Sequence, residues 1–207
     1  MKKKIDCNWH KYVDLGLPSG LLWATCNIGA SESWECGLYF SWGNVDGHKK
    51  GSGFYFGYEE HQSTPGWKLT TDIPVNAKYD AARANLGGSW RMPTTDEFAE
   101  LCKKRYTTNE WVTQNGVNGR RITSKINGNS VFFPASGIYY GEAILYGEGT
   151  YGRYWSSSLE SQTGVYNLAL DSGYAYPQNF SSRHYGFPVR AVLDHPKDSL
   201  IIRAIKR

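Results

Sequence analysis

Few residues of this chain have the types and spacing that catalysis or metal binding requires. Its five histidines are scattered and are predicted to lie mostly on surface loops. Glu59, Glu60 and His61 form an isolated triplet, which lacks the further ligands of a metal centre. Asp96 and Glu97 fall in the first turn of a predicted helix, where carboxylates stabilise the helix dipole without a catalytic role. The sequence therefore predicts no catalytic residues and no metal site.

The four cysteines do not form a metal or redox motif either. No pair is spaced as Cys-x-x-Cys, and no histidine lies near them at zinc-binding spacing. Cys26 and Cys36 would be able to pair in an exported protein, whereas buried free thiols are the favoured interpretation. Gly51–Gly53 lacks the strand and helix that flank a phosphate-binding loop. No cofactor is expected.

The net charge of +4 comes from the two ends of the chain. Between residues 5 and 196, 16 basic residues face 18 acidic ones. A face that binds nucleic acid normally carries a clustered basic patch, so no nucleic-acid partner is expected. The apolar runs are also far shorter than the roughly 20 residues that cross a bilayer. Residues 2–4 are basic, but no apolar segment follows them, so we expect neither a signal peptide in this chain nor membrane insertion.

The pattern of turns and apolar residues predicts many short elements. Residues 12–15 and 21–25 flank a Gly- and Pro-containing turn, which indicates a hairpin. Residues 31–43 are ambiguous, with Ser31 able to cap a short helix, and residues 44–75 show no period and are predicted to be a long irregular loop. The next element is a helix from Ala77 to Leu86, capped by Asn76 and ended by two glycines.

A second helix begins at the capping box formed by Thr94 and Glu97 and is expected to run to Arg105. Beyond it, residues 121–126 and 130–133 flank Asn-Gly as a hairpin, and strands are expected at about 153–158, 165–171 and 187–193. Early helices and late strands predict an α+β fold with two helices, antiparallel sheets and long irregular loops. We expect a single domain over residues 5–196 and a tail over 197–207.

The stretch from residue 151 to 187 has the composition of a binding surface. It holds six Tyr, seven Ser, four Gly and two Asn, and only four charged residues. Antibody combining sites are similarly rich in tyrosine, which gives large contact area at a small entropic cost. In residues 166–171 the side chains alternate, so Leu168 and Leu170 are expected to point into the core. Residues 179–185 are predicted to be a loop, and an ordinary polar sheet face is the alternative to a binding surface.

Several motifs resemble a known family. Trp90–Phe98 (WRMPTTDEF) resembles the Arg-Leu-Pro-Thr-x-x-Glu-aromatic motif of the C-type lectin-like fold of formylglycine-generating enzymes and their relatives. With further matching segments, nearly the whole chain is similar to paralogous lectin-like proteins of gut bacteria and their phages. The further segments are 13–24, 39–43, 127–137, 154–158 and 186–192. Four tryptophans in these motifs are expected in the core: Trp23, Trp42, Trp90 and Trp155.

Some members of that family are varied by diversity-generating retroelements, which miscopy template adenines and so scatter asparagine codons. The resemblance implies that residues 151–192 are a variable, ligand-binding region. Its expected contact positions face outward and carry residues reachable from an asparagine codon by changes at adenines. They are Asn167, Ala169, Asp171, Tyr174, Tyr176, Asn179, Phe180, Ser181, Ser182, His184 and Tyr185. Interleaved framework residues such as Pro177 and Arg183 would keep the fold.

Two departures from the family limit what the resemblance implies. The calcium-binding triplets of C-type lectins have no counterpart, because Tyr176–Asn179 contains no carboxylate. No cysteine follows Cys102, although formylglycine-generating enzymes need reactive cysteines in that half. The expectation is a non-catalytic receptor-binding protein or adhesin that binds a protein or glycan on a target cell, located on a phage virion or a bacterial cell surface. An oxidase relative, a structural tip module of a phage fibre or pilus, and a homo-oligomer stay open as alternatives.

Overall fold

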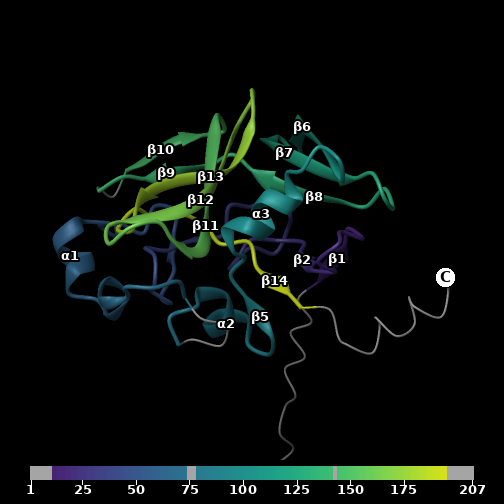
Figure 1. Cartoon of the computed structure of the whole chain (residues 1–207). Helices are drawn as coiled ribbons and strands as arrows, with labels where there is room; N and C mark the ends of the chain where they lie inside the picture. Colours follow the sequence, from purple (N-terminus) through teal and green to yellow (C-terminus); the bar gives the residue numbers. More distant parts are fainter. Residues whose placement is uncertain (1–10, 74–77, 142–143, 195–207) are drawn as a thin grey trace, which may run out of the picture.

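The protein, described here by a computed structural model, is mostly β. The structure describes residues 11–73, 78–141 and 144–194 (Figure 1). It is 40% strand and 12% helix, so the expected α+β fold class is wrong. The reason is local: turns interrupt the predicted helices early, and residues 107–182 form one strand after another. Every helix within the described residues is too short or too polar to cross a bilayer.

A four-stranded sheet brings distant parts of the chain together. Its order is β1-β2-β14-β5. The strands are β1 (Tyr12–Asp14), β2 (Leu22–Ala24), β14 (Val192–Leu193) and β5 (Trp90–Arg91). The antiparallel pairing of β1 with β2 confirms the predicted first hairpin. The strand expected at 187–193 is reduced to the two residues of β14.

A five-stranded sheet carries most of the region expected to bind a ligand, in the order β10-β9-β11-β12-β13. Its strands are β9 (Ser136–Tyr139), β10 (Leu145–Glu148), β11 (Tyr151–Leu159), β12 (Gly164–Asp171) and β13 (Ala175–Ser182). The strands predicted at 153–158 and 165–171 are confirmed as β11 and β12. The loop predicted at 179–185 is wrong in its first half, because β12 supplies antiparallel backbone partners as far as Ser182.

Two smaller sheets complete the strands. A three-stranded sheet contains β6 (Thr107–Gln114), β7 (Val117–Ser124) and β8 (Ser130–Pro134), and its β7–β8 pairing confirms the second predicted hairpin. A two-stranded sheet pairs β3 (Leu38–Tyr39) with β4 (His48–Lys49). The ambiguous segment 31–43 therefore contributes a short strand, and its described residues contain no helix.

The helices are short and lie between the strands. They are α1 (Tyr58–Gln62), the 3₁₀ turn η1 (Pro65–Lys68), α2 (Ala81–Leu86) and α3 (Thr95–Leu101). The prediction of one long loop over 44–75 is wrong where β4, α1 and η1 form. Asp80 caps α2, since its carboxylate accepts from the backbone of Ala82 and Arg83; the predicted cap Asn76 lies outside the described residues. The capping box of Thr94 and Glu97 is confirmed.

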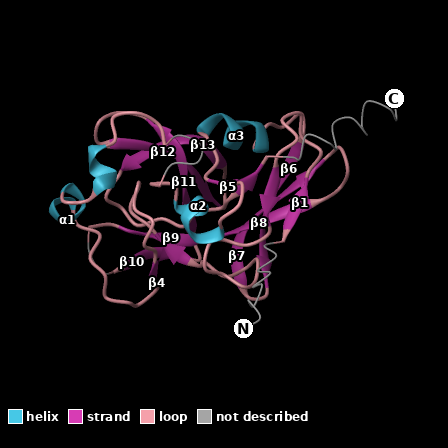
Figure 2. Cartoon of the chain, turned by 90° about the horizontal axis from the view of Figure 1, so that it is seen from below, coloured by secondary structure: helices cyan, strands magenta, loops and turns pink. Residues whose placement is uncertain are grey.

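Two hydrophobic cores pack against the five-stranded sheet, one on part of each face. Trp155 on β11 and Val165 on β12 belong to one core, while Tyr154, Leu168 and Leu170 on the same strands belong to the other. Helix α3 closes the second core and lies beside β12 and β13 (Figure 2). The four family-motif tryptophans are buried, as expected: Trp23, Trp42, Trp90 and Trp155.

Candidate functional site

The outer strand β13 and the turn before it expose three large aromatic side chains. Tyr174, Tyr176 and Phe180 are 53%, 50% and 63% exposed, and the expected outward position of all three is confirmed. In the described part of the chain, β13 is an edge strand of its sheet. Exposed aromatic side chains grouped on one strand are a common feature of contact surfaces, so this edge is taken as the candidate site.

The exposed aromatics do not all share one face of the sheet. Tyr176 pairs with Ala169, whereas Phe180 pairs with Tyr166. Positions 166 and 169 are three residues apart on β12, so their side chains point to opposite faces. A register shift between the two pairs adds one residue to β13 near Pro177, whose carbonyl accepts a hydrogen bond of 3.2 Å from the Thr95 hydroxyl. A partner of this strand therefore has aromatic contacts available on both sides of the edge.

Two expected contact residues are buried, so their predicted exposure is wrong. Asn167 and Ala169 are 0% and 2% exposed. Asn167 pairs with Trp155 in the register of β11 and β12, and so it lies at the edge of a packed core. Ala169 lies between Arg153 and Tyr176 in the pairing register, where longer side chains flank its methyl group. Alternation places both residues on the expected face, but a core packs beside Asn167, and neighbouring side chains of the sheet flank Ala169.

Asn179 and Ser181 hold the edge strand in place. The Asn179 side-chain amide donates to the Asn167 side-chain oxygen at 3.0 Å, and the Asn167 amide donates to the Ser181 hydroxyl at 3.2 Å. Both residues are half-buried. Three expected contact residues thus form a hydrogen-bonded link between β12 and β13.

Asp171 shapes the turn that presents Tyr174. One carboxylate oxygen accepts from the backbone N–H of Gly173 at 2.7 Å and of Tyr174 at 3.1 Å. The backbone N–H of Asp171 donates to the carbonyl of Tyr174 at 3.0 Å, which closes a hairpin with a two-residue loop. This aspartate therefore positions an exposed tyrosine.

The last expected contact residues, Ser182, His184 and Tyr185, are half-buried. The Tyr185 ring centre lies 4.6 Å from that of Tyr140 and 4.6 Å from that of His184. Tyr185 packs against the core that contains Trp155, and burial together with the Tyr140 hydroxyl raises its pKa to about 12. Burial lowers the pKa of His184. These three side chains are therefore packed partly against the rest of the protein and are less exposed than Tyr174, Tyr176 and Phe180.

Sequence reasoning missed the arginine at the centre of the exposed face. Arg153 pairs with Ala169, and Ala169 pairs with Tyr176. On the other side of β11, Gly152 pairs with Gly137 of the parallel strand β9, so Arg153 lies beside Ile138. Ile138 in turn pairs with Tyr146 of β10. These five residues cross all strands of the sheet on one face and are called the tyrosine–arginine row. They are Tyr146, Ile138, Arg153, Ala169 and Tyr176.

A signal for Arg153 was present in the sequence. Arg153 and Trp155 are two residues apart in the strand predicted at about 153–158, so they share a face, and β11 extends this face to Tyr151. Tyr151 borders the row: its ring lies against Gly147, where any Cβ would clash with it and where the backbone has a φ of +69°. Glycine is required at this position both for the backbone conformation and for the ring.

Arg153 has no hydrogen bond or ion pair to any residue in the described part of the chain, and its Nη1 atom is buried without a partner. Burial lowers the pKa of its guanidinium, while Tyr174, Tyr151 and Asp171 act in the opposite direction. A desolvated arginine without an acceptor is costly unless a ligand supplies one. The row therefore offers a cation flanked by tyrosines.

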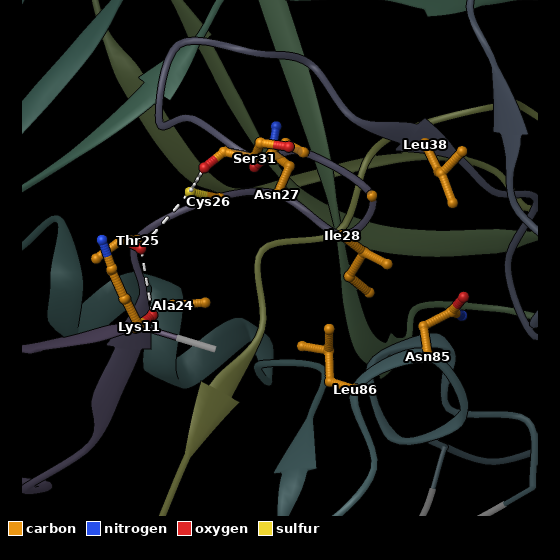
Figure 3. A pocket seen from close by; sticks show the side chains of 12 residues that line it. Lys11, Ala24, Thr25, Cys26, Asn27, Ile28, Ser31, Leu38, Asn85 and Leu86 are labelled. Atoms are coloured by element: carbon orange, nitrogen blue, oxygen red, sulfur yellow. Dashed lines mark hydrogen bonds between the residues drawn. The ribbon is translucent and has the colours of Figure 1, made fainter. Parts of the chain in front are cut away.

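A separate hollow of about 470 Å³ lies between β2, the segment after it and α2 (Figure 3). Its only charged lining residue is Lys11, and Cys26 in its wall donates to the Ser31 carbonyl at 3.5 Å. These groups do not pair an acid with a base, so the hollow is not arranged for general acid–base catalysis.

The cysteines of the described chain are unpaired, and one of its histidines is buried. Cys26, Cys36 and Cys102 are free thiols, so the alternative of a Cys26–Cys36 disulfide is not realised. Burial raises the pKa of Cys36 and raises that of Cys102 to about 12, which makes both poor nucleophiles. The expected surface position is wrong for His61, which is buried in α1. Within the described residues no three His, Cys, Asp or Glu side chains are grouped as metal ligands.

Comparison of the chain with protein-family models, with curated proteins and with solved structures gave no match. The family resemblance noted from the motifs therefore stays a prediction.

Proposed function

We propose that this protein is a non-catalytic ligand-binding protein, a receptor-binding protein or adhesin that holds a protein or glycan of a target cell surface. The contact surface is the tyrosine–arginine row together with Tyr174 and Phe180. The observation that carries the proposal is the exposure of Tyr174, Tyr176 and Phe180 on one ordered edge strand and its turn. Tyrosine and phenylalanine in such positions give large contact areas.

The frame beneath these side chains supports the proposal. Backbone pairs from Gly164 to Leu170 hold β13 along its length, the Asn167 network links the two strands, and Thr95 ties α3 to Pro177. A surface that is already ordered loses little conformational entropy on binding, which favours affinity. Exposed side chains on such a frame can also change without unfolding it.

The proposal includes variation of this surface by a retroelement, as the sequence resemblance implies. The exposed positions 174, 176 and 180 suit such variation, whereas the buried positions 167 and 169 tolerate it less. The genome around the gene tests this. We expect a reverse transcriptase gene nearby, together with a near-duplicate of the DNA that encodes residues 151–192. The near-duplicate is expected to differ from the coding DNA mainly at adenines. A duplicate whose differences fall on codons for buried residues would contradict it.

The binding experiment uses the triple variant Tyr174→Ala, Tyr176→Ala, Phe180→Ala. Labelled protein is measured on gut bacterial cells by flow cytometry and on a glycan array. The triple variant is expected to lose at least tenfold in binding, because the main contact area is removed. Its melting temperature is expected to stay within about 2 °C of the parent, since exposed side chains contribute little to stability.

Tyr12→Ala is the matched control, because Tyr12 is an equally exposed tyrosine on β1, in a different sheet. This variant is expected to bind as the parent does. Retained binding by the triple variant, or an equal loss in Tyr12→Ala, would contradict the proposed surface. A large fall in melting temperature would show that the three side chains are structural.

A further inference from the structure

We propose that Arg153 is the anchor of this surface and that it pairs with a carboxylate side chain, Asp or Glu, of a protein partner. This inference rests on the proposed function and narrows it to a partner with acidic residues at the contact. The argument starts from the contrast between Arg153 and the other arginines. Each of the four buried ones donates at least one hydrogen bond to an oxygen atom within the chain: Arg91, Arg120, Arg183 and Arg190. Arg120 and Arg183 also keep buried nitrogens without a partner, whereas Arg153 donates no hydrogen bond at all within the described chain.

The neighbours of Arg153 in the row cannot satisfy it. Ile138 on one side and Ala169 on the other have no side-chain acceptor. Every donor of the guanidinium lacks a partner in the described chain, and Nη1 is already shielded from water. A charged group that has lost part of its hydration gains from a new charge-assisted hydrogen bond, and a carboxylate matches a guanidinium with two parallel bonds.

The acid nearest to Arg153 in the register attracts it electrostatically but does not pair with it, and one of its carboxylate oxygens is engaged in a turn. Asp171 lies diagonally across the sheet, because it pairs with Tyr151 while Arg153 pairs with Ala169. One of its oxygens accepts two backbone N–H groups in the turn, and no ion pair joins it to Arg153. Glu148, near the end of β10, is paired with Lys50. The positive charge on this face is therefore complementary to an acid brought by the partner.

The placement of the aromatics favours a protein over a sugar. Tyr176 belongs to the face that carries Arg153, whereas Phe180 projects from the opposite face of the same edge strand. One sugar ring on the row would leave Phe180 without a contact. A protein surface can cover both sides of an edge strand, and arginine and tyrosine are the residues that dominate protein interfaces.

The experiment uses the full chain, labelled with ¹⁵N so that the Arg153 Nε–H group is observed by NMR. The probes are N-acetyl-L-glutamate N-methylamide, the corresponding neutral glutamine compound, and D-glucuronic acid as the sugar carboxylate. The glutamate compound is expected to shift the Arg153 signal saturably, with a Kd of about 1 mM to 10 mM as expected for a small fragment. The glutamine compound is expected to cause no saturable shift.

Variants assign the response to Arg153. With Arg153→Gln the glutamate-induced shifts of the backbone amides of Ala169 and Tyr176 are expected to disappear, and with Arg153→Lys to weaken. Arg121→Gln, on β7 in another sheet, is the control that keeps them. A saturable response to glucuronate without one to the glutamate compound would overturn the assignment to a protein. The absence of any response, or a response unchanged in Arg153→Gln, would overturn the anchor itself.

The binding of the variants to cells tests the arginine anchor and the proposed contact surface separately. If the aromatic triple variant loses binding and the Arg153→Gln variant also binds at least tenfold more weakly, the contact surface and the arginine anchor are both supported. If only the triple variant loses binding, the contact surface stands and the arginine anchor is wrong. If the triple variant keeps its binding, the proposed surface fails, whatever the NMR probes show.

Discussion

The side chains of Asn167 and Asn179 form a 3.0 Å hydrogen bond between neighbouring strands, and the first of the two is fully buried. From the sequence alone, both were interchangeable contact positions. The pairing shows that polar residues in this region have two different roles. Some are exposed to solvent, and others form hydrogen bonds that connect the edge strand to the sheet.

Asn167→Ala is expected to lower the free energy of unfolding by about 1–3 kcal/mol, because it leaves the partners Asn179 and Ser181 without their hydrogen bonds. Urea unfolding followed by circular dichroism measures the change. Gln178→Ala is the control: Gln178 is exposed on the same strand, so a change within about 0.5 kcal/mol is expected. Equal stability of both variants would mean that the asparagine network is not structural.

Tyr185 and Tyr176 are expected to respond differently to truncation. Tyr185→Ala removes a ring that contacts Tyr140 and lies 6.2 Å from Phe187, so a loss of about 2 kcal/mol is expected. Tyr176→Ala is expected to change stability by less than about 0.5 kcal/mol, because that ring is half exposed. Thermal unfolding of the two variants compares them directly. A larger loss for Tyr176→Ala would contradict its position on the surface.

His61 makes stability depend on pH below neutrality. Burial, together with the charge of Arg183 and with His184, lowers its pKa to about 3 in the folded chain, whereas an unfolded histidine titrates near 6.5. The unfolded state then binds more protons as pH falls from 6.5 towards 3, so stability is lost over that window. Between pH 7 and pH 5 the loss due to His61 is about 2 kcal/mol.

The test compares urea unfolding of the parent and of His61→Leu at pH 7 and pH 5. The variant cannot titrate at this position, so its stability is expected to fall by about 2 kcal/mol less than that of the parent. Acids elsewhere in the chain affect both proteins alike and cancel in the comparison. Equal losses in the two proteins would show that His61 is charged at pH 5 in the folded state.

Arg91 joins the start of α3 to the segment that follows β14. Its guanidinium donates two hydrogen bonds to Glu97, of 2.8 and 2.7 Å, and two to Asp194, of 2.8 and 3.4 Å. Arg91→Met is expected to cost about 3 kcal/mol, because Glu97 is left largely buried without its partner. Lys50→Ala breaks the exposed pair with Glu148 and is expected to cost less than about 1 kcal/mol. Similar losses in chemical denaturation would contradict the structural role of Arg91.

Much of the local structure was predictable because it depends on neighbours in the chain. Thr94 and Glu97 define a helix start within four residues, and the turn after Asp14 defines a hairpin. The helix after Asp80 was placed correctly only at its end, since Gly87 stops it. The loop predicted at 179–185 was wrong in its first half, because a polar strand is recognised only when a neighbouring strand binds its backbone.

The sequence by itself determined which residue types lie near residues 166–182 and that their side chains alternate between two faces. It also predicted that Tyr174, Tyr176 and Phe180 are exposed, because they do not continue the apolar alternation of Leu168 and Leu170. Only the tertiary structure decided which face is covered at each point. Asn167 is buried because cores pack on both sides of β12, and Arg153 lies between two tyrosines because strands distant in sequence pair beside it. Alternation gives a side chain its direction, but burial depends on what other parts of the chain place there.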